Sequence, residues 1–124
     1  MPFINDEVRD QGLDYADTNG TRIDICSQEP TTYSEATTDG TFSLGNKTGL
    51  NTGTTEAGAT DGRRVIVPAI TDGTVTETGT ATHWALTDGS AVLIAAGLLS
   101  SSQAVTDSNP FTLDAISITI RGPA

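Results

Sequence analysis

Apolar and polar residues alternate along much of this chain, and glycine-containing turn signals separate the alternating segments. Residues 21–27 show the pattern, because Ile23 and Ile25 fall on one face and the polar residues between them fall on the other. A period of two is the spacing of a half-buried strand. Thr-Asp-Gly and Thr-Asn-Gly triplets, which favour tight hairpin turns, close at Gly20, Gly40, Gly62, Gly73 and Gly89.

The spacing of these turns predicts an all-β fold of short antiparallel strands. The strands are expected at residues 21–27, 63–70, 74–78, 80–87, 91–96, 103–105 and 111–120. We therefore expect an antiparallel β-sandwich, of the jelly-roll or Ig-like kind, with about seven or eight strands. The apolar run 91–96 is expected to be a central strand, and 103–105 a short edge strand. The expected core comprises Val65, Val67, Trp84, Leu86, Val92, Ile94 and Ile118.

The last predicted strand changes the parity of its apolar positions halfway along. Phe111 and Leu113 occupy odd positions, whereas the three isoleucines that follow occupy even ones. A shift of one residue turns the apolar side chains of a strand to the opposite face. We therefore expect a β-bulge or a crossing between sheets near residues 114–115.

The first segment without a strand pattern is the N-terminus. Residues 1–20 are expected to form an arm that precedes a single β-sandwich domain at residues 21–124. Asn5, followed by two acidic residues, suits the start of a short helix that Gly12 would limit. An extended arm without a helix is the alternative. In either form, residues 2–17 are expected to contact other chains rather than their own core.

The second such segment, residues 45–62, is rich in glycine and threonine and contains one large apolar residue. A stretch of this length without a strand pattern is long for a loop in a compact domain. We therefore expect either a surface loop or an arm that lies on a neighbouring subunit. The candidate arm residues are Asn46, Lys47, Leu50 and Asn51.

The balance of charge argues against several kinds of partner. Six basic residues against 16 acidic ones give the 124-residue chain a net charge of −10. Nucleic acids and anionic membrane surfaces bind clustered lysine and arginine, so neither is expected as a partner. No apolar run approaches the roughly 20 residues that span a bilayer. The acidic N-terminal residues do not fit a secretory signal, so synthesis in the cytoplasm is expected.

The sequence shows no catalytic constellation, and we expect neither a cofactor nor a metal. His83 is the one histidine, and its place beside Trp84 in a predicted strand favours a structural or solvent-facing residue over a catalytic base. Residues 17–20 are similar to the start of a calcium loop, but the twelfth position, where such a loop needs an acid, is Gln28. We therefore expect a simple turn there and do not expect an enzyme.

Cys26 is the only cysteine, which excludes a disulfide within the chain. The alternation of its strand places Cys26 on the polar face with Arg22 and Asp24, away from the two isoleucines. Two outcomes are open for a lone cysteine on such a face. It is either a free thiol or the site of an intermolecular disulfide.

Several segments together form a pattern of strands and turns. A Thr-His-aromatic strand and turn, an aliphatic Leu-Ile-Ala-Ala-Gly-Leu-Leu run, Gln-x-Val and Phe-x-Leu occupy residues 81–89, 93–100, 103–105 and 111–113. An earlier strand, within residues 23–30, ends in a turn that contains proline. The pattern covers about two thirds of the chain. It resembles short virion proteins of tailed bacteriophages, which occur as head-decoration, minor capsid or fibre-type subunits.

The resemblance implies a non-enzymatic structural protein of the virion, made in the host cytoplasm and working without a cofactor. A capsid decoration, minor capsid or linking subunit would bind and stabilise neighbouring coat proteins, such as the major capsid protein, in an oligomeric particle. The alternative is a tail, collar or fibre subunit, with a receptor or a glycan as its ligand. The relatives tend to carry glycine where this chain has residues 108–110, which end in Pro110. Proline lacks an amide donor, so the next strand is expected to begin at a sheet edge.

Overall fold

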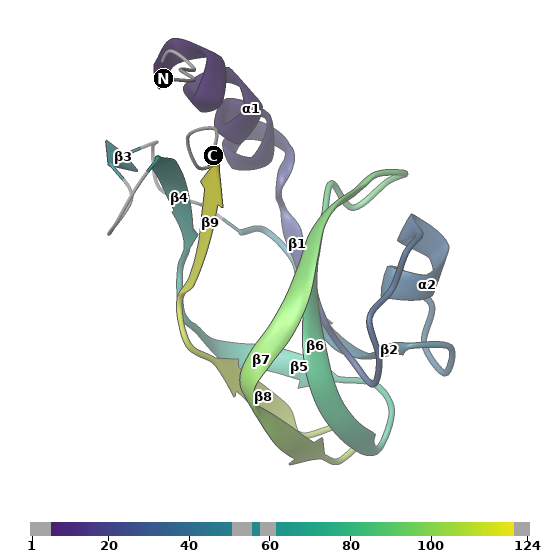
Figure 1. The fold of residues 1–124 in the computed structure, drawn as a ribbon. Helices are drawn as coiled ribbons and strands as arrows, with labels where there is room; N and C mark the ends of the chain where they lie inside the picture. Colours follow the sequence, from purple (N-terminus) through teal and green to yellow (C-terminus); the bar gives the residue numbers. More distant parts are fainter. Residues whose placement is uncertain (1–5, 51–55, 58–61, 121–124) are drawn as a thin grey trace.

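The chain is mostly antiparallel β, as the sequence predicts. The computed structural model describes residues 6–50, 56–57 and 62–120 (Figure 1). Six strands form a curled sheet in the order β7-β6-β1-β2-β5-β8, and a smaller sheet has the order β3-β4-β9. The larger sheet contains β1 (Arg22–Cys26), β2 (Ser43–Lys47), β5 (Ile70–Val75), β6 (Gly79–Thr87), β7 (Leu93–Val105) and β8 (Pro110–Leu113). The smaller one contains β3 (Glu56–Ala57), β4 (Arg63–Val67) and β9 (Ile116–Ile120).

One hydrophobic cluster takes side chains from both sheets. Its members are Ile23, Ile25, Leu44, Val67, Ile70, Val75, Ala81, Leu86, Val105, Phe111 and Leu113. Of the predicted core residues, Leu86, Val65 and Val67 are fully buried. Trp84, Ile94 and Ile118 are half-buried and pack against the cluster. The core therefore lies between the concave face of the large sheet and the small sheet.

Val92 was expected in the core, and this prediction is wrong. Its side chain is 38% exposed. The residue lies in the turn before β7, where Asp88 Oδ1 accepts hydrogen bonds from the backbone N–H groups of residues 90, 91 and 92. These three bonds lower the pKa of Asp88 and hold Val92 at the surface.

The predicted crossing between sheets near residues 114–115 is confirmed. Phe111 and Leu113 are buried in β8, which pairs with β5 in the large sheet. The chain then enters the small sheet, where Ile116 pairs with Val67 across β9 and β4. The change in apolar parity therefore marks the point at which one continuous segment serves two sheets. β8 is an edge strand, as expected from the proline at its start.

The apolar run 91–96 and the short strand 103–105 are parts of one long strand. β7 spans Leu93–Val105 and lies at the edge of the large sheet, so the prediction of a central strand is wrong. A continuous apolar run does not by itself distinguish a central strand from an edge strand whose two faces are both partly covered. Most residues of the first half of β7 are half-buried.

Three of the predicted turns are confirmed by their backbone conformation. Gly40, Gly62 and Gly89 have φ angles of 79°, 79° and 77°, the left-handed region that favours glycine. The turn predicted at Gly73 is wrong, because this glycine lies inside β5 and is paired with β8. Gly20 follows a helix, and its N–H donates to the carbonyl of the residue four positions earlier at 2.7 Å.

Two helices accompany the sheets in the described part of the chain, α1 (Asp6–Asn19) and α2 (Tyr33–Thr37). α1 continues through Gly12, so it is longer than the short helix predicted there. Leu13 and Ala16 are buried against Val65 of β4. The expectation that this segment contacts other chains rather than its own core is therefore wrong for these two residues, and residues 1–5 lie outside the described part. Figure 1 shows α1 above β4 and β9.

The segment 45–62 does not begin as the surface loop or arm that the sequence predicts, because its first residues belong to a strand. Asn46 and Lys47 belong to β2. Asn46 pairs with both β1 and β5, whereas Lys47 pairs with β1 alone. The Nζ atom of Lys47 lies 2.9 Å from the carboxylate of Asp72 in β5. The N–H of Leu50 donates to a backbone carbonyl beside β1, and its side chain packs against the core. Asn51 lies outside the described residues.

Candidate functional site

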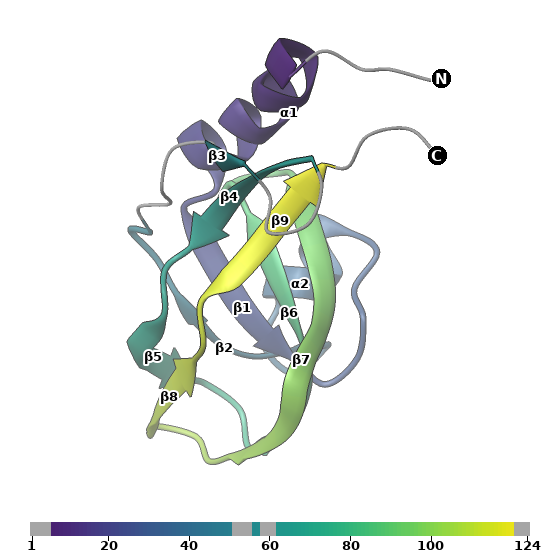
Figure 2. The same ribbon diagram turned by 60° about the vertical axis from the view of Figure 1, so that its left-hand side comes forward.

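The curled sheet nearly closes on itself where its two edge strands meet. The Nε2 atom of Gln103 in β7 donates to the carbonyl oxygen of Thr112 in β8 at 2.9 Å. Directly after β8 the chain leaves the large sheet and continues as β9. In the view of Figure 2, β9 lies on the β7 side of β4, and no described strand pairs with the outer edge of β9 or of β7. A seam therefore remains between the two sheets.

A large bulge in β7 lies beside this seam. Ala81 of β6 pairs with Gln103, and His83 pairs with Leu98. Two steps along β6 thus correspond to five along β7, so β7 contains three extra residues at this point. Extra residues bend a strand away from its partner, and bulges are common at sheet edges and beside binding sites.

The bulge leaves a groove of about 450 Å³, which we call the seam groove. Residues 98–100 of β7 form one wall, and residues 114–117, from the β8–β9 connection and the start of β9, form the other. Trp84 of β6 also lines the groove. A volume of this size falls within the range of about 300–1,000 Å³ that is usual for ligand pockets. The seam groove is therefore the candidate binding site of the chain.

The lining of the seam groove combines apolar side chains with the polar Ser100, Asp114 and Ser117. Leu98 is 73% exposed, whereas Leu99, Ile116 and Trp84 are half-buried. The indole of Trp84 packs against the backbone of β7 at Gly97, where an added Cβ atom would lie 3.0 Å from the indole Nε1 atom. Trp84 was predicted as a core residue, and it also forms part of this accessible surface.

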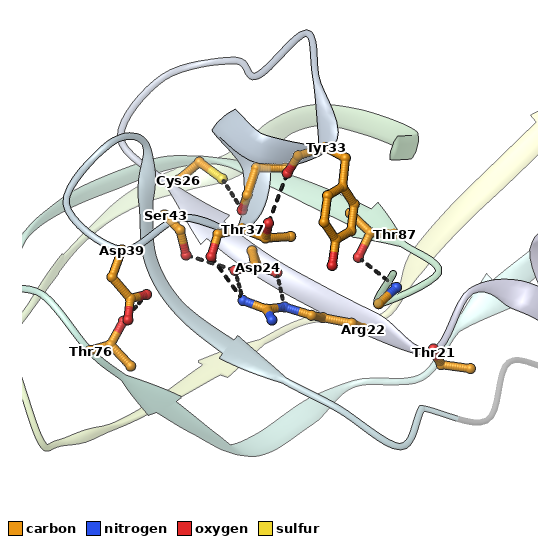
Figure 3. A network of polar contacts seen from close by, with 12 residues as sticks. Thr21, Arg22, Asp24, Cys26, Tyr33, Thr37, Asp39, Ser43, Thr76 and Thr87 are labelled. Atoms are coloured by element: carbon orange, nitrogen blue, oxygen red, sulfur yellow. Dashed lines mark hydrogen bonds and ion pairs between the residues drawn. The ribbon is translucent and has the colours of Figure 1, made fainter. Parts of the chain in front are cut away.

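A second cluster of polar side chains lies on the opposite, convex face of the large sheet (Figure 3). Asp24 and Ser43 are fully buried, whereas the side chain of Arg22 is 20% exposed. The Oδ1 and Oδ2 atoms of Asp24 accept hydrogen bonds from Arg22 Nε at 2.7 Å and Arg22 Nη2 at 3.0 Å. Ser43 Oγ donates to Asp24 Oδ2 at 2.7 Å. Burial raises the pKa of Asp24, and the hydrogen bonds from Arg22 and Ser43 oppose that rise.

This cluster attaches α2 to the sheet. Arg22 Nη2 also donates to the carbonyl oxygen of Thr37, at the end of α2, at 3.2 Å. Ala36 of α2 is fully buried against Cys26 and Ala85. The arrangement serves structure, because the carboxylate of Asp24 and the guanidinium of Arg22 are paired with each other and Arg22 also binds the end of α2.

Cys26 lies under α2, a position that favours the free thiol over the intermolecular disulfide, the two outcomes that the sequence leaves open. The sulfur atom has no exposed surface and lies 3.8 Å from the carbonyl oxygen of Ala36. The strand does place Cys26 beside Arg22 and Asp24, as predicted, but a helix covers that face. The signal missed in the sequence is Thr32, whose Oγ1 accepts a hydrogen bond from the backbone N–H of Glu35 and caps the start of α2.

We expect the thiol of Cys26 to resist alkylation in the folded protein. Burial, with a smaller contribution from the charge of Asp24, raises its pKa to about 12, and the thiolate is the reactive form. Iodoacetamide at pH 8 should modify folded protein at least about tenfold more slowly than protein unfolded in guanidinium, as followed by intact-mass spectrometry. Equal rates in the two states would contradict the buried position.

His83 has a local structural partner. Its Nδ1 atom lies 2.8 Å from Thr82 Oγ1, which also contacts the carbonyl oxygen of Ser27. Residues 17–19 belong to α1 rather than to the turn expected there. Within the described residues, no three histidine, cysteine or acidic side chains are grouped to hold a metal ion. None of the described helices is long and apolar enough to span a membrane.

A scan against protein-family models, a search of curated proteins and a search of solved structures each gave no match to this chain. The function is therefore inferred from the sequence pattern, the seam groove and the polar cluster under α2. The polar cluster under α2 is largely buried and paired within itself, whereas the seam groove is open.

Proposed function

We propose that this chain is a non-enzymatic structural subunit of a tailed-bacteriophage virion that binds and stabilises neighbouring coat proteins. A capsid decoration or minor capsid position is the first candidate. The observation that carries the proposal is the seam groove, an accessible surface of mixed polarity bounded by strand edges that no described strand covers. Open strand edges can accept a strand from another chain. The resemblance of residues 81–113 to small virion proteins supports the same role.

The packing of the two sheets supports a β-sandwich, the architecture expected of such a subunit. Val67 of the small sheet and Ile25 of the large sheet belong to one core cluster. The chain also passes directly from one sheet to the other at residues 114–115. Both features are typical of two sheets packed face to face.

Charge supports an outer position on the particle. A net charge of −10 would repel packaged DNA and suits contact with coat proteins. A tail, collar or fibre position is the alternative. A glycan-binding fibre module would be expected to present aromatic rings on loops, whereas Trp84, the only tryptophan, lies half-buried in a strand.

Purified virions test the proposal. Antibodies raised against the recombinant chain are expected to detect it in particles purified by density gradient, and immunogold labelling is expected to place it on the capsid. Labelling confined to the tail, collar or fibres would favour the alternative position. Absence of the chain from particles, at a detection limit below one copy per particle, would contradict the proposal.

A further inference from the structure

We infer that the seam groove binds a short, extended segment of a partner protein, which pairs with the free edge of β9 and carries a lysine or arginine. The inference rests on the proposed function, because it names how a neighbouring coat protein would be held. The two can fail separately, since the proposed function is tested on virions and this inference on the purified chain.

Backbone hydrogen bonding favours a segment in strand form. β9 pairs with β4 at every one of its five positions, from Ile116 to Ile120, without a shift in register. Ile116 and Ser117 of β9 line the seam groove, and no described strand pairs with the edge on that side. Backbone N–H and C=O groups along an open edge accept an added strand from another chain.

The bulge in β7 favours pairing with β9 rather than with β7. The three extra residues of β7 interrupt its regular edge beside the groove, and bulges are a common means of preventing strand addition. The edge of β9 is regular by comparison. A segment added there would extend the small sheet to β3-β4-β9-partner and would lie over Trp84.

Contacts at both ends limit the length of the segment. At one end, the hydrogen bond from Gln103 of β7 to Thr112 of β8 joins the two strands just before the chain enters β9. At the other end, Ile94 of β7 and Ile118 of β9 both pack against the cluster that contains Leu13 of α1. The groove is thus open over a few residues only, which suits a short segment with an apolar side chain directed at Trp84.

The charges around the seam groove favour a basic partner. Asp114 is exposed in one wall, and the described lining contains no lysine or arginine. With a net charge of −10 on the whole chain, a second copy would be repelled, whereas a segment with lysine or arginine beside Asp114 would be attracted.

Selection of binding peptides tests this inference. A displayed library of random heptapeptides is panned against the immobilised full chain, and the enriched peptides are synthesised with capped ends. We expect enriched sequences to combine alternating apolar residues with a lysine or arginine. Because Trp84 is the only tryptophan, its fluorescence reports directly on the groove, and a saturable change in its emission is expected on binding.

Matched variants locate the site. Leu98→Ser is expected to weaken binding about tenfold, whereas Val92→Ser, at another exposed apolar residue outside the groove, should leave the affinity unchanged. Asp114→Asn is expected to weaken a lysine-containing peptide about three- to tenfold and to leave its Lys→Gln analogue unchanged. Two peptides are compared, one N-methylated at the odd-numbered amides and the other at the even-numbered amides. Only one of the two should lose binding, because only one set of N–H groups faces β9.

Several results would overturn the inference. These are a failure to enrich any peptide, equal losses from Leu98→Ser and Val92→Ser, or an Asp114→Asn effect that does not depend on the lysine. Unchanged binding of both N-methylated peptides would exclude strand pairing. Saturable binding of a neutral oligosaccharide from a glycan array, with the Trp84 response and without peptide binding, would assign the groove to a glycan instead.

Discussion

Replacement of Asp24 by alanine is expected to lower the free energy of unfolding by about 3–5 kcal/mol. Asp24 is fully buried and accepts hydrogen bonds from Arg22 and Ser43. Removal of the carboxylate leaves a largely buried guanidinium without its ion-pair partner, and an uncompensated buried charge costs much more than an exposed one. Urea unfolding, followed by circular dichroism, measures the change.

The control variant is Asp39→Ala. Asp39 is exposed and accepts a hydrogen bond from Thr76 Oγ1 at 2.8 Å, so its loss should change stability by no more than about 0.5 kcal/mol. The double variant Arg22→Met, Asp24→Leu removes both charges and is expected to recover most of the loss. Equal stabilities of Asp24→Ala and Asp39→Ala would show that the buried ion pair does not hold α2 in place.

The second large effect is expected for Gly73→Ala, which should destabilise the chain by about 1–3 kcal/mol. Gly73 is paired with Phe111 across β5 and β8. A methyl group at residue 73 would overlap the ring of Phe111, and that ring is 3% exposed within the core. The ring would have to move into packed surroundings, which thermal and urea unfolding both detect.

A double-mutant cycle separates this overlap from the general effect of adding a methyl group. Phe111→Leu leaves more space, so Gly73→Ala should cost less in that background, and the two changes should not be additive. Gly79→Ala serves as a control, because its added Cβ would meet only the flexible end of Leu44, at 3.1 Å. Additive effects at residues 73 and 111 would contradict the close packing of β5 on β8.

The sequence predicts where the strands lie along the chain better than it predicts which strands pair with one another. Alternation locates β1 and β6, and the change of parity between Leu113 and Ile116 locates the crossing between sheets, because each signal depends on residues close together in the chain. Whether β7 lies at an edge depends on which strands pair with it. Its sequence carries no charged residue that would indicate an exposed edge. Gly73 was interpreted as a turn for the same reason, since the ring that covers it comes from a strand far along the chain.

The sites depend still more on long-range pairing. The polar face of β1 indicated exposure of Cys26, but α2 covers it and Arg22 pairs with Asp24 beneath the helix. The seam groove follows from three extra residues in β7 relative to β6, which become visible only once the register is known. Trp84 was placed correctly in β6, yet its exposure to a groove could not be inferred from alternation.

The central claim, that a neighbouring virion protein occupies the seam groove, is tested most directly by photo-crosslinking in intact particles. The photoreactive residue p-benzoylphenylalanine is introduced at Leu98, or at Val92 as the control, and purified virions are irradiated and analysed by mass spectrometry. We expect the residue 98 variant alone to yield a crosslink, and to one coat protein, within a short segment that contains lysine or arginine. Incorporation of both variants with no crosslink from residue 98, or with crosslinks from residue 92 alone, would contradict the claim.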